Sequence, residues 1–186
     1  SWESLIAAKD KEIGRLEGIY RNLLQGSKVE VHESRAEVLD PHTVRLTKTD
    51  AKVTARYILV ATGGQPSLGD DIPGRDLAIT SNQAFHLAKL PERIVIQGGG
   101  YIAVEFAGIF AGLGADVTLI YRGEQILRGF DDDIRNHLAA EMAKKGIEIR
   151  TQADVSKIEA SGTGVRVTLN DDTAFGAGQI MFATGR

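Results

Sequence analysis

The sequence contains no cysteine, few aromatic residues (6%) and no long apolar run. The absence of cysteine excludes disulfides, thiolate metal sites and cysteine nucleophiles within these 186 residues. No apolar stretch approaches the roughly 20 residues that span a bilayer. With a net charge of -3, nothing favours nucleic acid or an acidic membrane as a partner. The histidines lack the short spacing of metal ligands and are scattered at His32, His42, His86 and His137.

In other respects the composition is that of an ordinary globular protein. Apolar residues make up 42% and charged residues 25% of a chain long enough for one large domain or parts of two. The first residues lack a basic segment followed by an apolar one, so they do not predict a secretory signal. They also lack an initiator methionine, which leads us to expect a missing or processed N-terminus.

The first third of the chain predicts a long helix followed by short strands. Apolar residues recur at helical spacing over residues 3–25, and Gly26 is suited to end the helix. The continuous apolar run at residues 57–60 predicts a strand buried on both faces. Further strands are expected at residues 28–32, at 43–47 and from Val53 onward, with a turn near Asp40 and Pro41.

A change of composition follows this region. Residues 64–76 are rich in glycine, proline and aspartate, which predicts a linker. A short helix is expected to begin near Ser81, a good N-cap residue, and to end before Pro91. The linker and the short helix together indicate a connection between two domains.

From Pro91 the pattern alternates between strands and helices. The order strand, helix, strand predicts a right-handed parallel unit. Acidic residues open the second helix and lysines close it, which complements the helix dipole at both ends. An antiparallel appendage that turns at residues 170–172 and a last buried strand are expected to follow. The predicted strands are 93–97, 116–121, 146–150, 155–158, 165–169 and 179–182, and the predicted helices are 101–113 and 131–145.

A glycine motif lies between the first of these strands and its helix. Residues 98–103 read Gly-Gly-Gly-Tyr-Ile-Ala, which has the form G-x-G-x-x-A of dinucleotide-binding turns. Gly98 would permit the tight turn, Gly100 would let the backbone approach a diphosphate, and Ala103 would let the helix pack closely on the strand. The helix N-terminus would offer unpaired N–H groups to the phosphates. The alternative is a glycine-rich turn that binds nothing.

The end of the second strand bears on the choice between NAD and NADP. An NAD site usually places an acidic residue there to bond the ribose 2′-hydroxyl. This sequence has Tyr121 followed by Arg122, with Arg128 further along the loop. Two guanidinium groups suit a 2′-phosphate because each has a permanent charge and a planar fork of donors. We therefore predict NADP, while solvated arginines, or an NAD site that uses Glu124, are the alternatives.

The segment from Gly98 to Gly108 resembles the NADPH-binding segment of the pyridine nucleotide-disulfide oxidoreductases, and among them most closely that of the glutathione reductases. The resemblance implies that Arg122 and Arg128 grip the 2′-phosphate and that Tyr101 covers the nicotinamide pocket as a gate. It places Glu105 near the nicotinamide and Gly185 close to NADPH. The NADP contacts expected in total are Gly98, Gly100, Tyr101, Ile102, Ala103, Glu105, Arg122, Arg128 and Gly185.

The resemblance extends to the flanks of this segment. Residues 1–64 resemble the second half of a FAD-binding domain, in which Ala36, Thr62 and Gly63 would contact FAD. Tyr20 falls on a helix whose tyrosine lines the glutathione disulfide site, although it could equally be a packed tyrosine. The implied fold class is α/β. It combines a Rossmann-like NADP-binding domain (91–186), made of a parallel sheet with helices and an antiparallel appendage, with the partial FAD domain (1–64) through a linker and connecting helix (65–90).

The resemblance implies an NADPH-dependent flavoprotein disulfide reductase, of which this chain is an internal part. The first FAD glycine loop and the redox cysteine pair would precede Ser1, and the interface domain with its His–Glu pair would follow Arg186. We therefore expect no catalytic residue in this segment, which alone would be inactive, and no metal. The whole enzyme would reduce glutathione disulfide in the cytoplasm as a homodimer, with a role in cell redox homeostasis.

Several alternatives to this function stay open. Trypanothione reductase, dihydrolipoamide dehydrogenase and mercuric reductase belong to the same superfamily. Arg122 and Arg128 disfavour dihydrolipoamide dehydrogenase, which prefers NAD, whereas Tyr20 favours glutathione over trypanothione. A catalytically silent NADP-binding module is the remaining alternative, since the chain lacks the redox centre.

Overall fold

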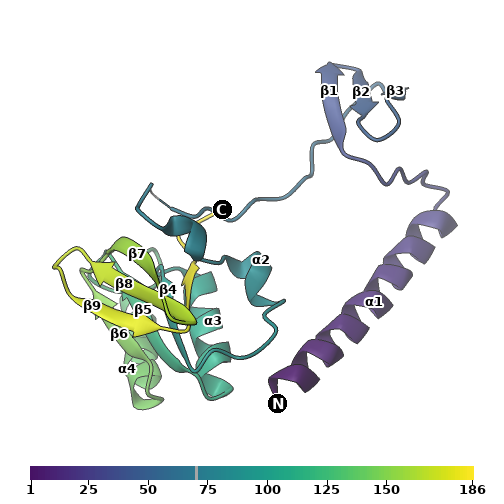
Figure 1. Ribbon diagram of the computed structural model, residues 1–186. Coiled ribbons are helices and arrows are strands. Elements are labelled where there is room, and N and C mark those ends of the chain that lie inside the picture. The colour runs from purple at the N-terminus through teal and green to yellow at the C-terminus, as the bar shows by residue number, and fades with distance from the viewer. Residues whose placement is uncertain (70) are drawn as a thin grey trace. The chain divides into compact units, whose positions relative to one another are not determined.

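A computed structural model describes residues 1–69 and 71–186. By its internal contacts the chain divides into two compact units (Figure 1). The larger comprises Ser1–Ile6 and Gly64–Arg186 and is called the α/β unit here. The smaller comprises Ala7–Gly63 and is called the smaller unit.

A four-stranded parallel sheet forms the centre of the α/β unit. The strand order is β10-β4-β5-β6, and helices connect β4 to β5 and β5 to β6. Ile96 lies beside Leu119 on one side and Met181 on the other. Three strands have the predicted bounds, and the fourth begins two residues later than expected. The strands are β4 (Arg93–Gln97), β5 (Asp116–Tyr121), β6 (Glu148–Thr151) and β10 (Gln179–Phe182).

Two helices make the crossovers of this sheet. Helix α3 (Tyr101–Gly112) joins β4 to β5, and α4 (Asp132–Lys144) lies between β5 and β6. Both confirm the predicted helices to within one residue at each end. The carboxylate of Asp131 caps α4 by accepting hydrogen bonds from the N–H groups of Asp133 and Ile134 at 3.0 and 3.3 Å. Such a cap satisfies helix donors that have no backbone partner.

A second, antiparallel sheet packs on the opposite face from the helices (Figure 1). It confirms the predicted appendage, but the turn at residues 170–172 joins β8 to a third strand that the sequence did not predict. That strand, β9, is rich in alanine and glycine, which have low strand propensity. The strands are β7 (Val155–Ser161), β8 (Gly164–Leu169) and β9 (Ala174–Ala177).

The parallel sheet is buried on both faces and therefore separates two apolar cores. Ile94 and Ile96 point into a core shared with the helices, which includes Phe110. Val95 points into a core shared with the antiparallel sheet, which includes Val167. Because successive side chains of a strand face opposite ways, one short strand supplies both cores.

The segment before β4 is part of the α/β unit and packs against its other elements. The Ser67 N–H donates to the Gly185 carbonyl at 2.9 Å, and the Ile158 N–H donates to Pro73 at 2.9 Å. A short 3₁₀ helix, η1 (Arg75–Leu77), and the short helix α2 (Ser81–Ala84) follow. The predicted cap at Ser81 is wrong by one residue. Thr80 caps α2, because its extended backbone lets its side chain accept from Asn82 while Gln83 completes a capping box.

The smaller unit contains most of the long helix and a three-stranded antiparallel meander. Helix α1 (Trp2–Gly26) confirms the prediction for residues 3–25. The strands are β1 (Ala36–Asp40), β2 (Thr43–Leu46) and β3 (Lys52–Thr54). The Asp40 carboxylate accepts from the His42 N–H at 2.8 Å at the predicted turn, and this bond lowers the pKa of Asp40.

Two strand predictions in the smaller unit are wrong. Residues 28–32 and 57–60 form no strand in the described part of the chain. Tyr57 and Leu59 are 86% and 89% exposed, although the apolar run predicted burial on both faces. A strand requires a neighbour for its N–H and C=O groups. Among residues 1–69 and 71–186, no segment pairs with either run.

The packing of the α/β unit predicts where truncation destabilises it. Leu119 is 0% exposed, and its replacement by alanine should lower the free energy of unfolding by about 2–5 kcal/mol through lost burial and a cavity. Ile134, 58% exposed on α4, is the matched control, for which alanine should change stability by about 0.5 kcal/mol or less.

The single tryptophan reports this unfolding. The Trp2 ring stacks on Phe110 at 5.9 Å, and its Nε1–H donates to the Leu87 carbonyl at 2.7 Å, both within the α/β unit. Urea titration followed by Trp2 fluorescence should therefore separate the two variants. Equal losses would show that Leu119 does not lie in the core.

Candidate functional site

The turn from β4 into α3 is constrained by the end of β10. Gly98 has a φ of 141°, a conformation that side chains disfavour. A Cβ at Gly98 would also lie 2.4 Å from the carbonyl oxygen of Ala183, which follows β10. The turn is held to β5 by the Gly98 N–H, which donates to the Ile120 carbonyl at 2.8 Å. Glycine is therefore required here by the fold itself.

Gly99, the middle one of the three consecutive glycines, is required by an aromatic ring. A Cβ at Gly99 would lie 2.4 Å from Cγ of Tyr121, and one at Gly123 would lie 2.6 Å from its Cε1. The Tyr121 ring thus packs directly against the backbone at both glycines. It occupies the end of β5, where an NAD site would carry an acidic side chain.

The third glycine differs from the first two. Gly100 is the N-cap of α3, and a Cβ there would meet no protein atom within 4 Å. Gly100 gives no side-chain cap to the helix, so the first N–H groups of α3 are available to a ligand. A helix N-terminus with free N–H groups and a partial positive charge favours an anion such as a phosphate.

These elements line one cleft at the carboxyl end of the parallel sheet. The cleft has a volume of about 750 Å³. Its walls come from the glycine turn, the start of α3, the loop after β5 and the residues that follow β10. Parallel α/β sheets bind their ligands at this edge, because the loops and helix N-termini converge there.

Arg122 and Arg128 supply positive charge to the cleft, which Arg186 also lines. Arg122 and Arg128 both line it and are both exposed. No described residue forms an ion pair or hydrogen bond with either guanidinium, so their donors are free for an anionic ligand. Glu124, the residue that could favour NAD, is exposed and is not among the residues that line the cleft.

The structure brings most of the predicted NADP residues together. Ala103 is the first exception, since it is fully buried between α3 and the sheet, where its small size allows close packing. Glu105 is the second, since it is exposed on α3 and does not line the cleft. The predicted residues that do line it are Gly98, Gly100, Tyr101, Ile102, Arg122, Arg128 and Gly185.

The residues predicted to contact FAD and the disulfide substrate lie in the smaller unit. Ala36 is the first residue of β1, and Thr62 and Gly63 follow the extended segment after β3. Tyr20 lies on α1 and is 66% exposed. All four are exposed, so each is accessible to a ligand or to another polypeptide.

Sequence reasoning missed a polar pair in the cleft, formed by Gln97 and Asp154. Gln97, the last residue of β4, is 4% exposed, and its Nε2 donates to the Asp154 carboxylate. The Oε1 of Gln97 is buried and has no partner among the residues described. A glutamine directly before the first glycine, at the end of an apolar strand, is a visible signal. The pairing of Gln97 with Asp154 depends on the tertiary fold, so no signal in the sequence indicates it.

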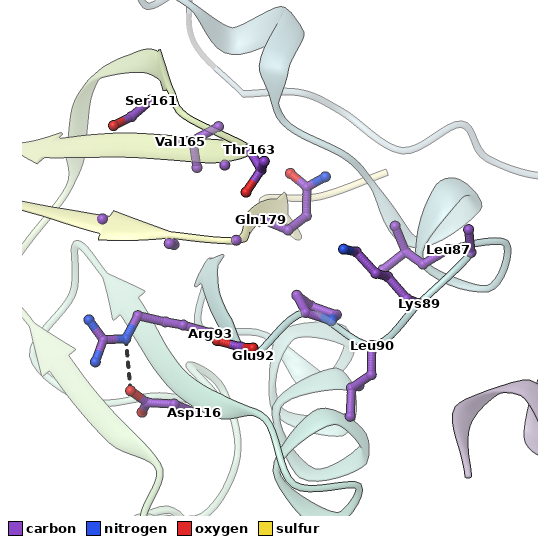
Figure 2. Close-up of a pocket in the computed structure, with 16 residues that line it drawn as sticks. Leu87, Lys89, Leu90, Glu92, Arg93, Asp116, Ser161, Thr163, Val165 and Gln179 are labelled. Atoms are coloured by element: carbon purple, nitrogen blue, oxygen red, sulfur yellow. Dashed lines mark hydrogen bonds and ion pairs between the residues drawn. The ribbon is translucent and has the colours of Figure 1, made fainter.

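A second cavity, of about 820 Å³, lies at the opposite edge of the sheet. Figure 2 shows Ser161 at the end of β7 and Thr163 in the following turn on one side, and the loop residues Leu87 and Lys89 on another. Arg93 and Asp116, the first residues of β4 and β5, form an ion pair at 2.8 Å in it. Helices return to this edge by their C-termini, whose partial negative charge disfavours phosphate. The cleft at the carboxyl edge is therefore the candidate cofactor site.

The described residues include no group of side chains that could hold a metal ion. Within the same part of the chain, no helix is long and apolar enough to cross a membrane.

Comparison with known proteins places this geometry in a family. The chain is 48% identical, over its whole length, to the glutathione reductase of Burkholderia cepacia, and it covers 41% of that protein. It is 39% identical to the trypanothione reductase of Leishmania donovani, again over its whole length and over 40% of that protein. The chain thus spans about two fifths of the length of these relatives.

A solved structure shares the fold. The HOCl-induced flavoprotein disulfide reductase RclA from Escherichia coli matches 97% of this chain and 42% of its own, with a TM-score of 0.89 and 28% identity. The family model for pyridine nucleotide-disulphide oxidoreductases matches residues 2–186. The chain therefore belongs to the pyridine nucleotide-disulphide oxidoreductase family.

Proposed function

We propose that this chain is the NADPH-binding segment of a flavin-dependent glutathione-disulfide reductase. The observation that carries the proposal is the convergence in one cleft of a glycine turn, a free helix N-terminus and two unpaired arginines. This set of donors matches the chemistry of NADPH, whose diphosphate and 2′-phosphate both require positively polarised donors. The names of the relatives support the assignment to a disulfide reductase.

Each part of the cleft has a distinct role in this proposal. The backbone at Gly98 and Gly100 and the first turn of α3 bind the diphosphate. Arg122 and Arg128 bind the 2′-phosphate, which NADH lacks. When bound, NADPH would supply a hydride to FAD, and the reduced flavin would pass two electrons on to a disulfide. Tyr101 is 58% exposed at the start of α3, from where its ring acts as a gate over the nicotinamide.

We propose further that residues 1–64 belong to a FAD-binding domain, that residues 65–90 connect it and that residues 91–186 bind NADP. The division of the chain between Gly63 and Gly64 supports the first boundary, whereas Ser1–Ile6 group with the α/β unit. Ala36, Thr62 and Gly63 contribute contacts to FAD. The exposed apolar run at residues 57–60 supports this assignment, because an additional part of such a domain would cover it.

Glutathione disulfide is the proposed substrate of the whole enzyme, with Tyr20 as one of its contacts. The most specific support is the identity of 48% to a glutathione reductase. The relative named trypanothione reductase, 39% identical, makes that activity the second candidate. Comparing kcat/KM for the two disulfides in the full-length enzyme would decide between them. A cytoplasmic location and a homodimer complete the proposal.

Replacement of Arg122 by alanine should weaken binding of NADPH selectively. Loss of one charge-assisted bond to the 2′-phosphate should cost about 1.5–3 kcal/mol, which is roughly 10- to 150-fold in Kd. Binding of NADH should change little, because NADH has no 2′-phosphate. Isothermal titration calorimetry of both nucleotides measures the difference.

The matched control for this experiment is Arg166→Ala. Arg166 is an exposed arginine on β8 and is not among the residues that line the cleft. Its removal alters the net charge by the same amount, yet it should leave both affinities unchanged. Equal weakening of NADPH and NADH by Arg122→Ala would contradict the proposed role of Arg122.

Replacement of Gly100 by alanine should separate binding from stability. A methyl group at Gly100 meets no protein atom, so the free energy of unfolding should change by about 1 kcal/mol or less. The same methyl group projects from the cleft backbone towards the diphosphate, so NADPH and NADH should both bind roughly tenfold or more weakly.

Gly99→Ala is the comparison for Gly100→Ala. A methyl group at Gly99 collides with the Tyr121 ring, so this variant should lose about 1–3 kcal/mol of stability. Urea unfolding and calorimetric binding of both variants test the contrast. Unimpaired binding by Gly100→Ala would rule out a diphosphate at this backbone.

A further inference from the structure

The loop between β5 and α4, residues 122–131, carries both arginines of the cleft and is fixed at several points. Ile126 and Leu127 are 0% and 6% exposed, because their side chains enter the core shared with the helices. The Leu127 N–H donates to the Gly99 carbonyl at 2.6 Å, which ties this loop to the glycine turn. Leu127 has a φ of 56°, an unfavourable conformation for leucine that needs support from its surroundings.

One side chain of α4 supplies such support. The Nε of Arg135 donates to the Ile126 carbonyl at 2.8 Å, and its Nη2 donates to the Gln125 carbonyl at 3.0 Å. Its Nη1 donates to Asp132 at 2.6 Å, which fixes the guanidinium from the outer side. The Arg135 side chain is only 18% exposed. All three nitrogens of this guanidinium are therefore engaged within the protein.

We propose that Arg135 is a positioning residue for recognition of the 2′-phosphate, an inference that rests on the proposed binding of NADPH. Arg135 does not line the cleft, and its donors face the loop carbonyls. It therefore acts through the loop, by holding the backbone from which Arg122 and Arg128 project. A loop that is ordered before binding loses less conformational entropy when the phosphate arrives.

The geometry distinguishes this role from a simple charge effect. The bonds to two successive carbonyls use the planar fork of a guanidinium, which a lysine ammonium cannot reproduce. Arg135→Lys keeps the positive charge near the cleft but loses the pair of hydrogen bonds to the two loop carbonyls. Arg135→Gln loses both. If charge alone mattered, the lysine variant would behave as the original protein.

The test compares two small probes of the adenosine end of the cofactor. The dissociation constants of 2′,5′-ADP and 5′-AMP are measured by calorimetry on the 186-residue chain. We expect both Arg135→Lys and Arg135→Gln to bind 2′,5′-ADP roughly tenfold more weakly, with 5′-AMP changed by less than about twofold. In the Arg122→Ala, Arg128→Ala background, Arg135→Lys should have no further effect on 2′,5′-ADP. Unchanged affinity of Arg135→Lys for 2′,5′-ADP would overturn the proposal.

Hydrogen exchange provides a readout that does not depend on binding. The Leu127 amide, which donates to Gly99, should exchange faster in Arg135→Lys than in the original chain. Lys144→Gln is the matched control. Lys144 lies on the same helix and forms an ion pair with Glu141 at 2.6 Å, and it does not contact the loop through this pair. This control should alter neither the exchange nor the affinities. Unchanged exchange at Leu127 in Arg135→Lys would argue against the clamp.

A second variant covers the case in which Arg135 variants unfold. Asn136 accepts a hydrogen bond from Gln125 Nε2 at 3.0 Å, which is another tie between α4 and the same loop. Asn136→Ala should lower the affinity for 2′,5′-ADP in the same selective way, and unchanged affinity would count against the proposal. If the original chain itself does not prefer 2′,5′-ADP to 5′-AMP, the proposed NADPH site fails. If the original chain has that preference and the variants keep it unchanged, only the role of Arg135 is refuted.

Discussion

The cleft depends on the close approach of three backbone segments at the end of β4. The Ala183 carbonyl occupies the space of a side chain at Gly98, and the Tyr121 ring occupies that space at Gly99. The Leu127 N–H then reaches the Gly99 carbonyl. Any side chain at Gly98 or Gly99 would push these segments apart. The turn is therefore held in place by contacts with the end of β10, with β5 and with the arginine loop. Binding groups placed on such a rigid support need little reorganisation when a ligand arrives.

This constraint explains why the three consecutive glycines are not equivalent. The fold itself excludes side chains at Gly98 and Gly99, whereas Gly100 faces open space and is free of any such demand from the protein. A glycine that packing does not require, located at the N-cap of a helix with free N–H groups, is compatible with the proposed diphosphate, which would approach the backbone closely. Gly100 is therefore the residue that most directly supports the proposed diphosphate site.

Local patterns predicted the parts of the molecule that local contacts determine. The strands and helices from Arg93 to Lys144 follow from apolar periodicity and capping residues, and the glycine motif located the cleft. The run at residues 57–60 was mispredicted, because an apolar segment becomes a strand only beside a partner, and none lies within the described residues. The sequence did not predict the contact of Gln97 with Asp154 or that of Arg135 with the loop carbonyls, because tertiary folding brings these groups together.

In the proposed site, different elements account for affinity and for selectivity. The glycine turn and α3 present donors to a diphosphate, which NADH and NADPH share. The loop after β5 presents Arg122 and Arg128, the proposed contacts to the 2′-phosphate, and this loop is held from α4 by Arg135. The backbone hydrogen bond from Leu127 to Gly99 joins the two parts. Changes to the α4 side of the loop are therefore expected to affect the choice of cofactor more than the diphosphate cradle, because β5 and β10 also hold the cradle.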